Sequence, residues 1–232
     1  MVVSIHQPYF FPWLGYLNKV VSCDKFVILD DVQFRKGYFQ NRAHIKNSNS
    51  EKVYLTLPVV KSKLNSLIYQ IKLTEKYNHI SLYSTLVNYY KTSPYWHEYK
   101  EDLKEVLFST NGSLDEIVLK SMFFLFDKLD NIPTFYNSSE LDISENDPTL
   151  RLVKLCKELE ADTYLSGKSG KDYLDLSKFK KEGINVEFQD FDVNKLQYDQ
   201  IGDKFVSGLS AIDVLLNSGI TGLNKLTYKN DN

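Results

Sequence analysis

Two polar residues with catalytic potential, His6 and Gln7, follow directly after a short apolar segment near the N-terminus. Residues 8–16 then contain two prolines, a glycine and otherwise aromatic or apolar side chains. Since proline fixes φ and removes a backbone donor, this segment predicts a stiff turn at the end of a strand. An imidazole there can act as a general base, and a carboxamide can orient a substrate or stabilise an oxyanion. The alternative is a structural role, in which both side chains satisfy buried backbone groups.

A second pair of candidates, Asp30 and Asp31, follows the next apolar segment, residues 26–29. A carboxylate at the carboxyl end of a strand can bind sugar hydroxyls or act as a general base. We predict a catalytic role for Asp31 and a substrate-binding role for Asp30, with a hydrogen-bonded turn as the alternative. No Asp-X-Asp or Glu-X-X-His motif accompanies the pair. The sequence therefore predicts no metal site.

The polar segment 36–46 is a candidate for binding phosphate. It contains Asn41 and Arg42, and a planar guanidinium can bind two phosphate oxygens at once. The alternative is a solvated surface loop. We also expect Tyr9, from the aromatic turn after His6, to contact the sugar or base of a substrate.

A second phosphate-binding candidate is the segment Gly167, Lys168, Ser169 and Gly170, between a predicted strand and a predicted helix. Glycines permit close backbone approach to an anion, and lysine adds positive charge. The segment lacks Walker A spacing, and an ordinary strand-to-helix connection is the alternative. We predict that Lys168 supplies local positive charge for a phosphate together with Arg42.

The pattern of apolar segments predicts the elements that position these residues. Strands are expected at 2–5, 26–29, 133–136, 163–165 and 186–191, with 52–60 pairing with 67–73. Helices are expected at 13–21, 148–159, 173–181 and 210–217, with Gly219 ending the last. Alternating strands and helices predict an α/β fold with a Rossmann-like, mostly parallel sheet. We expect a single domain over 1–225, a largely helical insertion at about 75–130 with a capping box at 113–116, and a polar tail at 226–232.

Composition excludes several classes of function. The 232 residues carry a formal net charge of −2, with 43% hydrophobic and 25% charged residues, which gives no electrostatic case for binding nucleic acid or an anionic membrane. No apolar segment reaches the length of a membrane span, and the N-terminus does not resemble a signal peptide. Cys23 and Cys156 show no metal-ligand spacing and are expected to be structural. A cytoplasmic location with reduced thiols follows.

Several motifs resemble the WbqC-like family, which is associated with bacterial surface-polysaccharide and O-antigen gene clusters. They are the segments at 6–16, 24–34, 40–46, 55–59, 163–167 and 209–213. The resemblance covers nearly the whole chain. It implies a role in modifying a sugar, such as acyl or aminoacyl transfer to a nucleotide-linked amino sugar. No cofactor is firmly implied by the resemblance; the acyl or aminoacyl group would come from a donor on a carrier protein, such as an acyl-carrier protein, or on a coenzyme.

Two classes of function remain. In a transferase, His6 is the general base that takes a proton from the attacking amine. In a non-catalytic scaffold, the chain presents a glycan intermediate to another enzyme. Replacing His6 by Ala distinguishes them, because it abolishes turnover only in the transferase. Ligands of open α/β sheets bind at the carboxyl ends of the strands, so we expect one cleft lined by His6, Gln7, Asp31, Arg42 and Ser169.

Overall fold

The centre of the protein is a five-stranded parallel sheet. The structure is a computed structural model that describes residues 1–61, 65–108 and 110–228. The strand order is β5-β2-β1-β6-β7. The strands are β1 (Val2–His6), β2 (Lys25–Ile28), β5 (Thr134–Asn137), β6 (Thr163–Ser166) and β7 (Asn185–Phe188). The predicted α/β fold is confirmed, and the predicted strands 2–5 and 26–29 are adjacent and parallel.

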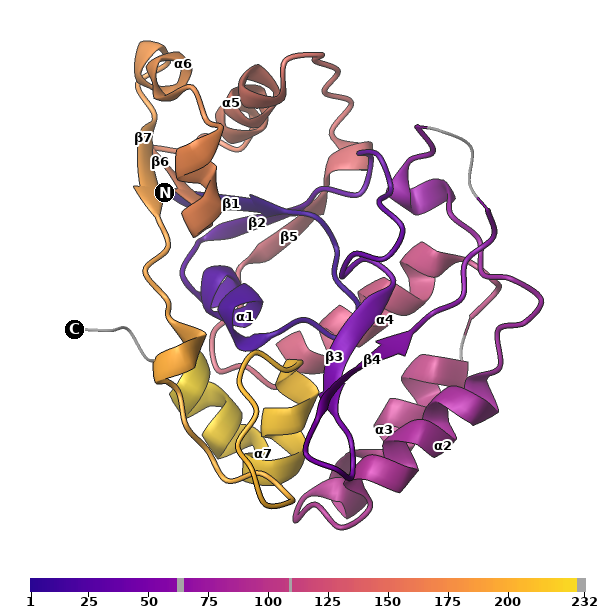
Figure 1. The fold of residues 1–232 in the computed structure, drawn as a ribbon. Coiled ribbons are helices and arrows are strands. Elements are labelled where there is room, and N and C mark those ends of the chain that lie inside the picture. The colour runs from indigo at the N-terminus through magenta and orange to yellow at the C-terminus, as the bar shows by residue number, and fades with distance from the viewer. Residues whose placement is uncertain (62–64, 109, 229–232) are drawn as a thin grey trace.

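Helices cover both faces of this sheet. They are α1 (Leu14–Val21), α2 (His79–Tyr90), α3 (Trp96–Phe108), α4 (Leu114–Phe126), α5 (Pro148–Glu158), α6 (Leu176–Lys181) and α7 (Ala211–Thr227). In Figure 1, α5 and α6 lie above the sheet, and α1 and α7 lie below it. Among the described helices, none combines the length and apolar character needed to cross a bilayer.

The alternation of side chains along each strand explains the two layers. Val3, Ile5 and Val27 pack with α5 and α6 in one core cluster. Phe26 and Ile28 point to the opposite face and join the larger cluster, which includes α1, α4 and α7. Successive side chains of a strand point to opposite faces, so a strand buried on both sides has a continuous apolar sequence.

The polar segment 36–46, whose alternative interpretation was a solvated surface loop, contains a strand. Residues 42–46 form β3 (Arg42–Lys46), which pairs antiparallel with β4 (Lys52–Thr56) in a separate two-stranded sheet. Ala43 and Ile45 are buried in the larger core, and they alternate with the polar residues Arg42, His44 and Lys46. This is the pattern of a half-buried strand. The predicted pairing of 52–60 with 67–73 is reduced to one isolated bridge, Val59 with Leu73.

Helix boundaries were predicted less accurately than helix positions. The region predicted as a helical insertion carries α2, α3 and α4. Asp147 caps α5 by accepting a hydrogen bond from the Leu150 amide. The predicted capping box at 113–116 is wrong, because the Ser113 side chain makes no cap bond. Gly219 ends the first of two helical segments of α7, as predicted: its φ of 66° and ψ of −172° are non-helical, and a second segment continues beyond this kink to Thr227. Of the predicted tail, residues 229–232 lie outside the described residues.

Candidate functional site

The sheet has a topological switch point between β1 and β6. From β1 the chain proceeds to β2 and β5 on one side of the sheet, and to β6 and β7 on the other. The loops that leave the two strands therefore diverge and open a crevice at their carboxyl ends. His6 is the last residue of β1, and Gly167 directly follows β6. Both of these residues line the crevice.

Two cavities of about 500 Å³ each occupy this crevice and share part of their walls. We call them the aromatic cavity, which includes Trp13 and Phe191, and the basic cavity, which includes Arg35 and Arg151. The residues that line both are His6, Tyr9, Lys19, Gly167 and Ser169. Ligands in the two cavities would thus meet at these five residues.

His6 lies where the two cavities meet. One of its ring nitrogens is hydrogen-bonded within the described part of the protein, and the other is not. Its Nδ1 lies 2.9 Å from the Gln7 carbonyl oxygen, which can only accept, so Nδ1 carries the proton. No described residue hydrogen-bonds to Nε2, whose lone pair is available in the neutral ring. The rings of Tyr9 and Tyr16 meet the imidazole edge-on, with centroids at 4.8 and 4.7 Å. Burial, reinforced by the charge of Lys19, lowers the pKa of His6 to about 3. The imidazole is therefore neutral at physiological pH.

Lys19 is the functional candidate that sequence reasoning missed. It is 3% exposed, and its Nζ donates a 2.8 Å hydrogen bond to the Ile5 carbonyl. Among the described residues, no carboxylate forms an ion pair with it. Burial lowers the pKa of Lys19 to about 8. Charged groups are rarely buried without a partner of opposite charge. The available signal in the sequence was a lysine within a short, mostly apolar helical segment.

Gln7 and the Gly167–Gly170 segment also lie at the crevice. Gln7 lines the basic cavity, and its Oε1 accepts a 2.7 Å hydrogen bond from Gln40 Nε2. Lys168 lines the aromatic cavity and lies 3.4 Å from a carboxylate oxygen of Asp190. Gly170 is buried behind the loop, where an added Cβ would lie 2.1 Å from Ser166 Oγ. The crevice thus receives Gln7, Lys168 and Ser169, and Gly170 supports the loop from behind.

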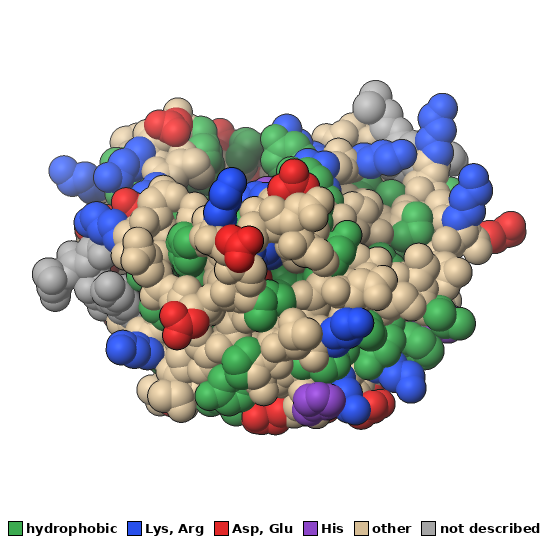
Figure 2. All heavy atoms as spheres, turned by 60° about the horizontal axis from the view of Figure 1, so that its bottom comes forward, with side chains coloured by type: hydrophobic (Ala, Val, Ile, Leu, Met, Phe, Trp, Pro, Cys, Tyr) green, Lys and Arg blue, Asp and Glu red, His purple; other side chains and the backbone are tan. Residues whose placement is uncertain are grey.

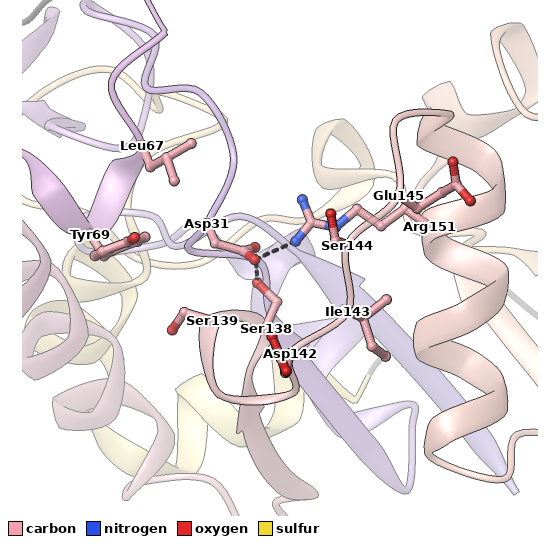
Figure 3. A pocket seen from close by; sticks show the side chains of 10 residues that line it. All are labelled: Asp31, Leu67, Tyr69, Ser138, Ser139, Asp142, Ile143, Ser144, Glu145 and Arg151. Carbon is pink, nitrogen blue, oxygen red and sulfur yellow. Dashed lines mark hydrogen bonds and ion pairs between the residues drawn. The ribbon is translucent and has the colours of Figure 1, made fainter.

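The two aspartates after β2 lie beside the crevice. Asp30 is 3% exposed and accepts hydrogen bonds from the Ser139 amide at 2.9 Å and from the hydroxyls of Ser138 and Ser139. The Asp30 carboxylate therefore links, through hydrogen bonds, the loops that follow β2 and β5. Asp31 forms an ion pair with Arg151 and accepts a hydrogen bond from Ser138, as Figure 3 shows. Asp31 lines a smaller neighbouring cavity of about 280 Å³, to whose wall Arg151 also contributes.

Asn41 and Arg42 lie apart from the crevice. Asn41 is 3% exposed, donates to the Leu57 carbonyl at 2.9 Å and accepts from the Gly37 amide at 3.2 Å. The guanidinium of Arg42 lies 3.9 Å from the centre of the Tyr54 ring. Neither residue is among those that line the two cavities. The expected convergence is therefore partial: His6, Gln7 and Ser169 share a cavity, while Asp31 and Arg42 do not line it.

The charges around the crevice favour an anionic ligand. Among the described residues, Lys19, Arg35 and Arg151 line the basic cavity, and no aspartate or glutamate lines either cavity. The protein as a whole carries a formal charge of −2, and on the face in Figure 2 acidic and basic side chains are interspersed. The positive charge at the crevice is thus a local feature.

Metal and thiol chemistry receive no support from the described residues. No group of three or more His, Cys, Asp or Glu side chains among them is placed to hold a metal ion. Burial raises the pKa of both Cys23 and Cys156 to about 12, so neither forms a reactive thiolate at neutral pH.

Comparisons with known proteins support the family suggested by the motifs. The WbqC-like protein family matches residues 7–225. A curated relative, the uncharacterized protein Rv1507c of Mycobacterium tuberculosis, is 26% identical over 228 residues, which cover 97% of each chain. No solved structure matches. The family match includes the turn after His6, the Gly167–Gly170 segment and nearly all of the fold, so this chain belongs to the WbqC-like protein family.

Proposed function

We propose that this protein is a transferase that moves an acyl or aminoacyl group onto the amine of a nucleotide-linked amino sugar in bacterial surface-glycan biosynthesis. The observation that carries the proposal is the placement of His6 and Lys19 at the wall shared by two cavities. Group transfer requires the donor and the acceptor to meet at one point. The wall shared by the two cavities is such a meeting point. The donor would be a coenzyme or a carrier protein. Free cysteines fit a reaction in the reducing cytoplasm.

The proposed chemistry uses the two side chains in complementary roles. The sugar amine attacks the acyl carbonyl carbon, and a tetrahedral intermediate forms whose oxyanion lies against the Lys19 ammonium. His6 Nε2 takes the proton that the amine loses on forming the new C–N bond. The bond to the donor then breaks, and the imidazolium returns this proton to the leaving group. An imidazolium with a low pKa is a strong acid, so it donates this proton readily.

The negative charge of the intermediate also assists the proton transfer. In the resting protein, burial and the charge of Lys19 both disfavour a proton on His6. An oxyanion beside Lys19 offsets the second of these effects while the imidazole is protonated. The tautomer is set in advance, because the Gln7 carbonyl holds the Nδ1 proton. His6 is therefore oriented to accept the proton only at Nε2.

Turnover by wild type and two variants tests the proposal. UDP-linked amino sugars are incubated with acyl-coenzyme A or aminoacyl donors, and the N-acylated product is detected by mass spectrometry. We expect His6→Ala to lower turnover by about 10²–10⁴-fold, the usual contribution of a general base, while nucleotide-sugar affinity stays near that of wild type. Tyr54→Phe, on the β4 surface away from the crevice, is the control. Wild type that binds these ligands but forms no product would instead support the scaffold role.

A further inference from the structure

Three basic side chains and no carboxylate line the basic cavity among the described residues, although Asp31, which does not line it, pairs with one of them. The three are Lys19, Arg35 and Arg151. Lys19 is committed to the acyl transfer in the function proposed above. The two arginines have no role in that chemistry, yet a guanidinium is the side chain best suited to bind phosphate oxygens in pairs.

Arg151 is held in place but has unused hydrogen-bonding capacity. Its guanidinium pairs with Asp31 through one terminal nitrogen (Figure 3), and its side chain is 16% exposed. Its Nε is buried and has no hydrogen-bond partner. Because an unpaired buried donor is costly, the geometry favours a ligand oxygen on the open side of this guanidinium. Arg151 lines the basic cavity, and the ion pair with Asp31 restrains the orientation of its guanidinium there.

Arg35 lies at the exposed end of the same cavity and is positioned by the loop that carries it. Its guanidinium stacks 3.9 Å from the centre of the Tyr38 ring. The Arg35 backbone amide donates a 2.8 Å hydrogen bond to Gln40 Oε1. The side-chain Nε2 of Gln40 in turn donates to Gln7 Oε1, directly after β1. Arg35 forms no ion pair with any described carboxylate. Its charge is therefore available at the mouth of the cavity.

Building on the proposed function, we propose that Arg35 and Arg151 bind the diphosphate of the nucleotide-linked sugar in the basic cavity. Arg35 meets the diphosphate at the solvent side, and Arg151 meets it from α5. The sugar then extends inward toward the wall shared by the two cavities, where its amine reaches His6. This arrangement leaves the aromatic cavity, with Trp13 and Phe191 in its wall, for the acyl donor.

Arg42 provides a matched control for this assignment. Its guanidinium also lies 3.9 Å from a tyrosine ring, and its Nε is also buried without a hydrogen-bond partner. It differs from the other two arginines in that it does not line the cavity. Any effect of general charge or of an unpaired guanidinium nitrogen would therefore appear in Arg42→Gln as well.

Titration calorimetry with inorganic pyrophosphate tests the assignment. We expect Arg35→Gln and Arg151→Gln each to weaken binding by about 10- to 100-fold, the range for losing hydrogen bonds to a charged group. Arg42→Gln should bind like wild type. If Arg151→Gln fails to fold, Arg151→Lys keeps a positive charge beside Asp31 but loses the planar pair of donors, and it should still weaken binding, by a smaller factor. Equal losses in Arg35→Gln and Arg42→Gln, or no binding to wild type, would overturn the proposal.

Competition then identifies the source of the diphosphate. A UDP-linked sugar should displace pyrophosphate, whereas coenzyme A, which also contains a diphosphate, should not. Displacement by coenzyme A alone would assign the basic cavity to the donor and refute our assignment. If no donor gives product but Arg35→Gln still loses affinity for pyrophosphate, the anion site stands and the transferase proposal fails.

Discussion

Replacing Lys19 by Met should make the protein more stable while removing its activity. The pKa of Lys19 falls from an ordinary 10.5 to about 8 on burial. At 1.36 kcal/mol per pKa unit, the charged form therefore costs about 3 kcal/mol at pH 7. Methionine has a similar shape without this cost, but it leaves the Ile5 carbonyl without its Nζ donor, a loss of about 1–2 kcal/mol. The net expectation is a gain of about 1–2 kcal/mol in the free energy of unfolding.

The pH dependence of this difference identifies its cause. Below pH 8, Lys19 is protonated in both the folded and the unfolded state, so the full cost is present. Between pH 8 and 10.5 the folded protein releases the proton while the unfolded chain still holds it, so wild-type stability rises with pH. The advantage of Lys19→Met should therefore disappear over this interval.

Urea unfolding of wild type and Lys19→Met at pH 7 and pH 10 measures both effects. The tyrosines of the unfolded chain also titrate near the upper end of this range, but they are common to both proteins and cancel in the difference. If Lys19→Met is the less stable protein at pH 7, or if the difference is the same at both pH values, the buried charge is not the cost that we describe.

Three further predictions concern the same site and the helix behind it. Turnover should decrease above about pH 8, where Lys19 loses the proton that stabilises the oxyanion; a pH–rate profile with no decrease up to pH 9.5 would contradict this. Between pH 6.5 and 3 the unfolded chain protonates His6 but the folded protein does not. Wild type should therefore lose about 3 kcal/mol more of its free energy of unfolding than His6→Gln between pH 7 and pH 4, measured by urea unfolding at both pH values. Gly219→Ala should lower the free energy of unfolding by at least about 2 kcal/mol, measured by thermal unfolding, because φ is 66° and the added Cβ would lie 2.6 Å from Tyr95. Gly167→Ala is the comparison, because φ there is −66° and the added Cβ would have no neighbour within 4 Å.

The sequence allowed the sheet to be predicted because its strands are buried on both faces and bounded by turn residues. The apolar segments at β1 and β2 and the proline-rich turn after His6 were sufficient to place the two strands side by side. The strand at 42–46 was missed because polar residues of 36–41 precede it, and only Ala43 and Ile45 carry its apolar alternation. Short strands with one polar face resemble loops in composition.

The site could be predicted only where position along the chain determines position in space. His6, Gly167 and Ser169 follow strands of the same parallel sheet, so the carboxyl ends of those strands bring them together. Arg42 was chosen for its chemistry, but its strand belongs to the separate hairpin. Arg151 was not considered, because its contribution to the cavity depends on the packing of α5 and on the ion pair with Asp31. Contacts of that kind are set by tertiary structure and leave no local pattern.

The central place of β1 has a consequence for the order of folding. β1 pairs with β2 after about 20 residues, but its other neighbour, β6, lies about 160 residues further on. At roughly 5–20 residues per second, the ribosome needs about 10–30 s to make that intervening chain. Until then Val3 and Ile5 lack the cover that α5 and α6 provide. The crevice that carries His6 is therefore completed only late in synthesis, when β6 docks against β1.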